Sequence, residues 1–63
     1  MEKSKAKQMA REIRGFVVGN QAELAKVIHE YCIGMSDEDY YLIEDTYFEM
    51  EKAGEFDDIT GIQ

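Results

Sequence analysis

The chain of 63 residues contains no proline, and it has one cysteine and one histidine. The absence of proline leaves every position free to join a helix, and the five glycines stand apart, at positions typical of element boundaries. We therefore expect an all-α fold rather than a turn-rich β protein. A chain of this length makes one domain at most, and its hydrophobic core is small.

A single cysteine cannot form an internal disulfide, and the N-terminal stretch MEKSKAKQMAREIR lacks the apolar run of a secretory signal. Both features favour a reducing, cytoplasmic setting. No apolar stretch approaches the roughly 20 residues of a membrane span. We expect a soluble protein that does not act at a membrane.

Residues that carry catalytic or metal chemistry are also scarce. His29 and Cys32 stand three apart, but helical angles place Cys32 on the buried face and His29 at its polar margin, with no further His or Cys. Two such side chains fall short of the four ligands of a structural zinc site. The segment DEDYYLIED lacks the central glycine and alternating oxygen ligands of a calcium loop. The sequence thus predicts a protein without enzymatic activity, metal or cofactor.

Positive charge is scarce in the second half of the chain. Residues 1–18 carry five cations and two anions, whereas residues 36–63 carry one cation and ten anions, within a net charge of −7. Phosphate contacts dominate nucleic-acid affinity, so a chain this acidic is a poor direct ligand of nucleic acid. It is suited instead to a basic protein surface.

The apolar residues predict a single domain over 1–63, a compact bundle of three helices at about 4–18, 21–33 and 37–53. In the first helix, apolar residues recur at helical spacing and Gly19 is the expected stop. Asn20 and Glu23 form a capping-box pattern before the second helix, which Gly34 ends. The apolar positions of these two helices are Ala6, Met9, Ala10, Ile13, Phe16 and Val17, then Leu24, Val27, Ile28, Tyr31 and Cys32.

The third helix has clear signals at both ends. Ser36 is a favourable N-cap, three carboxylates fill the first turn, and Gly54 follows the last apolar position. Beyond it, Phe56, Ile59 and Ile62 stand three apart, which predicts a short further helical turn or an apolar tail laid on the bundle.

At 100° per residue, the third helix divides into faces. Its expected core line is Tyr40, Ile43, Tyr47 and Met50, and opposite it lie two rows of carboxylates, Asp37, Glu44 and Glu51 in one and Glu38, Asp45 and Glu49 in the other. Tyr41 and Phe48 lie between the rows. Either they cover the edges of the core, or they form a contact surface, as aromatic residues flanked by charge often do.

The first helix carries Lys3, Lys7, Arg11 and Arg14 on one face. This basic face is either an ordinary solvated edge or a second contact surface. Its charge is complementary to the acidic rows of the third helix.

Three functions follow from these patterns. The first is a small acidic interaction module, with the general character of phage-encoded inhibitors, whose carboxylate rows replace phosphates on the basic nucleic-acid-binding surface of a partner protein. The eight residues expected to touch that partner are Asp37, Glu38, Tyr41, Glu44, Asp45, Phe48, Glu49 and Glu51.

The alternative is a self-associating accessory subunit, in which two chains pair the basic first helix with the acidic third helix as a homodimer. The third and weakest reading is a regulator of the helix-turn-helix type, since two helices meet at a glycine. There the acidic residues from Asp37 to Asp45 would be repelled by DNA phosphates.

Overall fold

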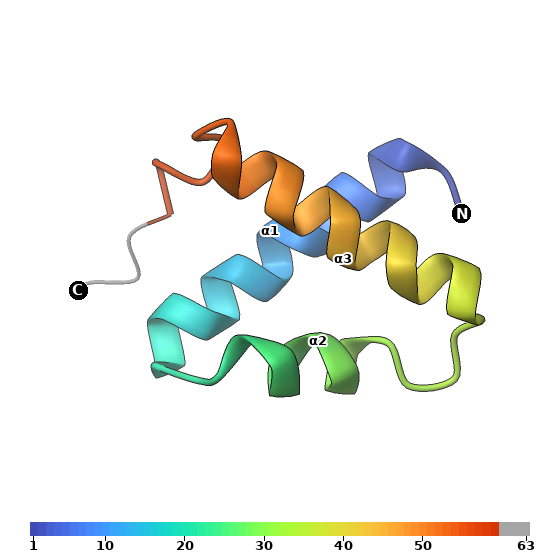
Figure 1. Cartoon of the computed structure of the whole chain (residues 1–63). Helices are drawn as coiled ribbons and strands as arrows, with labels where there is room; N and C mark the ends of the chain where they lie inside the picture. Colours follow the sequence, from blue (N-terminus) through green and yellow to red (C-terminus); the bar gives the residue numbers. More distant parts are fainter. Residues whose placement is uncertain (60–63) are drawn as a thin grey trace.

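The computed structural model describes residues 1–59, and within them the chain forms three helices and no strand. These are α1 (Lys3–Asn20), α2 (Leu24–Tyr31) and α3 (Asp37–Lys52). α1 and α3 cross each other, and the short α2 packs against α1 at one side of this crossing (Figure 1). The predicted all-α bundle of three helices is confirmed.

The core lies where α1 crosses α3 and where α2 leans on α1. Ala6 and Ala10 are fully buried, and their small side chains let α1 come close to α3. The other buried residues are Ile13 from α1, Val27, Ile28 and Cys32 at α2, Ile43, Thr46, Tyr47 and Met50 from α3, and Phe56 from the C-terminal segment.

The junction between α1 and α2 differs from the prediction. α1 continues through Gly19 to Asn20, and the chain turns at Gln21, whose φ of 52° is left-handed. The N–H of Ala22 donates to the carbonyl of Val17 at 3.0 Å and closes the helix end. A glycine inside a helix costs only about 1 kcal/mol, so Gly19 does not stop it.

The predicted capping box at Asn20 was wrong. The Asn20 side chain donates to the Phe16 carbonyl at 3.1 Å, so it satisfies the end of its own helix rather than the start of the next. α2 begins at Leu24, after an extended Glu23 that makes no side-chain cap. Phe16, predicted on the core face, is exposed and meets the Tyr31 ring edge-on.

α2 is also shorter than predicted at its far end. Its last residue is Tyr31, and the Cys32 N–H is shared between the carbonyls of Ile28 and His29 as the helix unwinds. Gly34, with a φ of 85°, provides the predicted left-handed stop. With only eight residues, α2 spans about 12 Å and covers a limited part of α3.

Both ends of α3 agree with the sequence signals. The Ser36 hydroxyl accepts from the Asp39 N–H at 3.3 Å. At the other end, Gly54 has a φ of 76°, its N–H donates to Glu51, and the next N–H donates to the carbonyl of Met50 at 2.9 Å. This pair of bonds is a Schellman motif, and it turns the chain back toward the bundle.

The segment after Gly54 folds onto the bundle in consecutive turns. Phe56 is 4% exposed and Ile59 packs against the core, so the predicted apolar tail is confirmed for these two residues. Ile62 lies outside the described residues.

The fully buried Thr46 has no hydrogen-bond partner for its hydroxyl within the described residues. We predict that Thr46→Val, which replaces the hydroxyl by a methyl of similar size, raises the free energy of unfolding by about 1 kcal/mol. Urea unfolding measures the change. Thr46→Ala is the control and should lower stability, because it leaves a cavity. A loss of stability in the valine variant would show that the hydroxyl is satisfied.

Gln21 occupies a left-handed conformation that disfavours a residue with a Cβ. Gln21→Gly is expected to stabilise the chain by about 0.5 to 1 kcal/mol, measured by thermal unfolding. Gly34→Ala tests the same effect in reverse. Its added Cβ meets no atom within 4 Å, so the expected destabilisation arises from φ alone. Equal stability of all three chains would contradict the prediction.

Candidate functional site

The outward side of α3 carries two exposed aromatic rings. Tyr41 is 59% exposed and Phe48 is 46% exposed, whereas Ile43 and Met50, on the opposite side of the helix, are buried. Both rings are therefore exposed at the surface of the bundle and do not belong to its core. Their ring faces add apolar surface to a strongly charged side of the molecule.

Tyr41 lies within a set of four carboxylates. Asp37 and Glu38 precede it by four and three residues, and Glu44 and Asp45 follow it by three and four, which are the neighbouring positions on a helix surface. None of the four belongs to a salt bridge within residues 1–59. We call Tyr41, Phe48 and these four residues the acidic–aromatic face.

The remaining members of the carboxylate rows, Glu49 and Glu51, pair with α1. The Lys3 ammonium lies 2.8 Å from Glu49, and the Arg14 guanidinium lies 2.9 Å from Glu51. The charges of Glu49 and Glu51 are therefore balanced within the chain. Within residues 1–59, the four carboxylates around Tyr41 make no such internal pair.

Most residues of the predicted basic face of α1 also form ion pairs within the chain. Arg11 binds Asp58 and the carbonyl of Glu55, and Lys7 lies close enough to Glu49 to contribute to lowering its pKa. The N-terminal ammonium lies 3.1 Å from Asp39. These contacts direct Lys3, Arg11 and Arg14 toward α3 and the C-terminal segment.

Arg14 makes the most varied contacts of these cations. Its guanidinium donates to the hydroxyl of buried Tyr47 and to Glu51, each at 2.9 Å, and lies 5.3 Å from the centre of the Phe56 ring. The bond to Tyr47, followed by the bond to Glu51, raises the pKa of Arg14 despite its partial burial. Arg14 therefore joins α1, α3 and the C-terminal segment.

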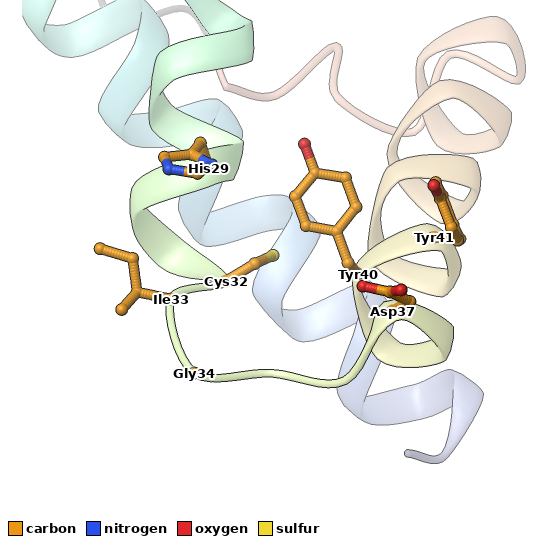
Figure 2. Close-up of a pocket in the computed structure, with 7 residues that line it drawn as sticks. All are labelled: His29, Cys32, Ile33, Gly34, Asp37, Tyr40 and Tyr41. Atoms are coloured by element: carbon orange, nitrogen blue, oxygen red, sulfur yellow. The ribbon is translucent and has the colours of Figure 1, made fainter.

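A groove opens between the end of α2 and the start of α3, with a volume of about 580 Å³ (Figure 2). Tyr40, predicted in the core, is half-buried and forms part of the groove wall, because the short α2 does not cover this side of α3. The lining residues are His29, Cys32, Ile33, Gly34, Asp37, Tyr40 and Tyr41. The groove was not predicted from the sequence, although Ile33, an apolar residue immediately before Gly34 at the end of α2, is a visible signal of it.

His29 and Cys32, the residues weighed for catalysis and metal binding, both line the groove. Burial, followed by the nearby charge of Glu44, raises the pKa of the Cys32 thiol, which disfavours the nucleophilic thiolate. Within residues 1–59, no three His, Cys, Asp or Glu side chains are grouped so that they could hold a metal ion. Over the same residues, no helix has the length and apolar character to cross a membrane.

Comparisons of the chain with protein-family models, with curated proteins and with solved structures find no match. The interpretation of the site therefore depends on its own geometry and charge.

The ion pair of Lys3 with Glu49 has a consequence for acid stability. The hydrogen bond from Lys3 lowers the folded-state pKa of Glu49 below its ordinary value of 4.5. Its stabilising contribution is thus present above that value and is lost as the pH falls through the lowered pKa. We predict that Lys3→Gln raises the pKa of Glu49, measured by NMR titration of the side-chain carboxyl carbon.

The matched control is Lys5→Gln, which removes the same charge from an exposed position outside the observed ion pairs. It should leave the Glu49 titration nearly unchanged. Equal effects of the two substitutions would show that Glu49 responds to overall charge and not to the Lys3 contact.

Proposed function

We propose that this protein is a small interaction module that binds the basic, nucleic-acid-binding surface of a partner protein through the acidic–aromatic face of α3. The observation that carries the proposal is the arrangement around Tyr41: an exposed ring with four carboxylates on its neighbouring helix positions and no internal cation paired to them within the described residues.

The charge of the acidic–aromatic face suits it to a basic surface. Lys and Arg side chains that normally contact phosphates also bind carboxylates, and Arg does so with paired hydrogen bonds. Asp37 and Glu44 lie seven residues apart on one side of Tyr41, and Glu38 and Asp45 repeat this spacing on the other. Each pair is separated by about 10 Å along a rigid helix, so negative charge is displayed at regular intervals.

The two exposed aromatic rings suit the same face to a stable interface. A charged rim alone gives steering and salt-dependent association, whereas most of the affinity at an interface comes from a few buried anchors, often aromatic. Tyr41 and Phe48 stand seven residues apart between the carboxylates and are available for this role. A partner that covers both rings would remove water from the ion pairs around them.

The internal ion pairs favour this proposal over self-association. Pairing of basic α1 with acidic α3 between two chains would require Lys3 and Arg14 to leave the carboxylates that they contact within one chain. Two acidic–aromatic faces would also repel each other. The proposed setting remains the cytoplasm, where such partners are abundant.

The test is a binding assay against a panel of purified nucleic-acid-binding proteins with basic surfaces. We expect at least one to bind the fluorescently labelled chain, more weakly at about 200 mM than at about 50 mM salt, and to release it when a DNA duplex is added. No binding across the panel, or binding unaffected by the duplex, would contradict the proposal.

Two variants test the face itself. Phe48→Ala is expected to weaken binding about tenfold or more, with little effect on thermal unfolding because the ring is partly exposed. Asp45→Lys should weaken binding and its salt dependence. The matched control is Glu12→Lys, which makes the same charge change on an exposed position of α1 and should retain most of the affinity.

A further inference from the structure

We propose that the groove between α2 and α3 receives an arginine side chain from the bound partner protein. This inference rests on the proposed function and specifies the chemistry of the partner segment next to Tyr41. It concerns a second part of the surface, since the groove extends from Tyr41 across the α2–α3 loop to Ile33.

The groove offers apolar surface that the chain itself leaves uncovered. Figure 2 shows Tyr40 extending from α3 into the space between the two helices, with Cys32 facing it from the end of α2. Ile33 is 74% exposed and Tyr41 is 59% exposed. A side chain with an aliphatic stem could lie along the Tyr40 ring, while Ile33, which points away from Tyr40 in Figure 2, adds exposed apolar surface at the edge of the groove.

The charge around the groove selects a cation. Asp37 lines the groove, and Glu44 lies two helical turns along the same side of α3, close enough to Cys32 to affect its thiol. No Lys or Arg is among the lining residues, and the cations of α1 described above contact other parts of the molecule. A positively charged side chain in the groove therefore meets carboxylates without competition from a cation of the lining.

The combination of rings and carboxylates favours arginine over lysine. A guanidinium group is planar, stacks on an aromatic ring and binds a carboxylate through two parallel hydrogen bonds. A lysine ammonium is a compact and strongly hydrated charge that gains less from the Tyr40 ring. The groove volume of about 580 Å³ is ample for one such side chain.

The first experiment is an NMR titration of the isotope-labelled chain with three capped five-residue peptides of glycine that carry a central arginine, lysine or glutamine. We expect the arginine peptide to shift the signals of residues 29–41 most, the lysine peptide to bind several-fold more weakly, and the glutamine peptide to have no effect. Equal shifts with arginine and lysine, shifts centred on Phe48, or no shifts would overturn the assignment.

Variants distinguish binding in the groove from attraction by the overall negative charge of the chain. The pair Asp37→Asn and Glu44→Gln should weaken binding of the arginine peptide about tenfold, whereas Glu12→Gln with Glu23→Gln, the same charge change at exposed positions outside the acidic–aromatic face, should alter it by less than about twofold. Ile33→Ser, at an exposed position, should also weaken it without loss of helix content. Equal losses from both carboxylate pairs would refute a specific groove.

The outcomes distinguish this inference from the proposed function. If a basic partner protein binds in a manner that depends on Phe48 while the arginine peptide leaves the groove signals unchanged, the groove assignment alone is wrong. If neither binds, both proposals fail.

Discussion

The ion pairs between α1 and the C-terminal half of α3 determine what the remaining surface can do. Lys3 and Arg14 neutralise Glu49 and Glu51, and Arg11 does the same for Asp58. Each exposed pair contributes little to stability by itself. Their effect is to distinguish Glu49 and Glu51, whose charges are balanced within the molecule, from the four carboxylates around Tyr41, which have no internal cation partner among residues 1–59.

The small size of the protein explains why this division is accompanied by a groove. The core is concentrated where α1 crosses α3, with Ala6 and Ala10 at the close approach and Tyr47 as the largest fully buried side chain. α2 has only eight residues and packs mainly on α1. The side of α3 at Tyr40 therefore lacks a helix to cover it, and the α2–α3 loop becomes an accessible edge.

Local signals in the sequence predicted the helix ends that depend only on neighbouring residues. The Ser36 cap and the Gly54 end of α3 follow from capping chemistry. Helix geometry separated Tyr41 and Phe48 from the expected core line but left open whether they cover the edges of the core. Asn20 shows where such signals become ambiguous. One amide can cap the helix that follows or bind a carbonyl of the helix that precedes, and the second contact formed.

Long-range packing determined which ion pairs form and which side chains of α3 are exposed. The pairing of Arg11 with Asp58 joins residues 47 positions apart, and periodicity does not specify which carboxylate a cation will meet. The partial exposure of Tyr40 depends on the length of α2, which the sequence analysis overestimated. The acidic–aromatic face could thus be outlined from the sequence. Which carboxylates of α3 lack an internal ion pair, and where the adjoining groove lies, depended on the arrangement of all three helices.

The crowding of like charge around Tyr41 also makes the free protein locally frustrated. The helix holds Asp37, Glu38, Glu44 and Asp45 near one another with no internal cation paired to them within residues 1–59, so their mutual repulsion opposes the folded state. A bound cation would relieve that repulsion only in the folded state, where the carboxylates are held together. In the proposed complex, the protein would gain stability at the very residues that reduce its stability when it is alone.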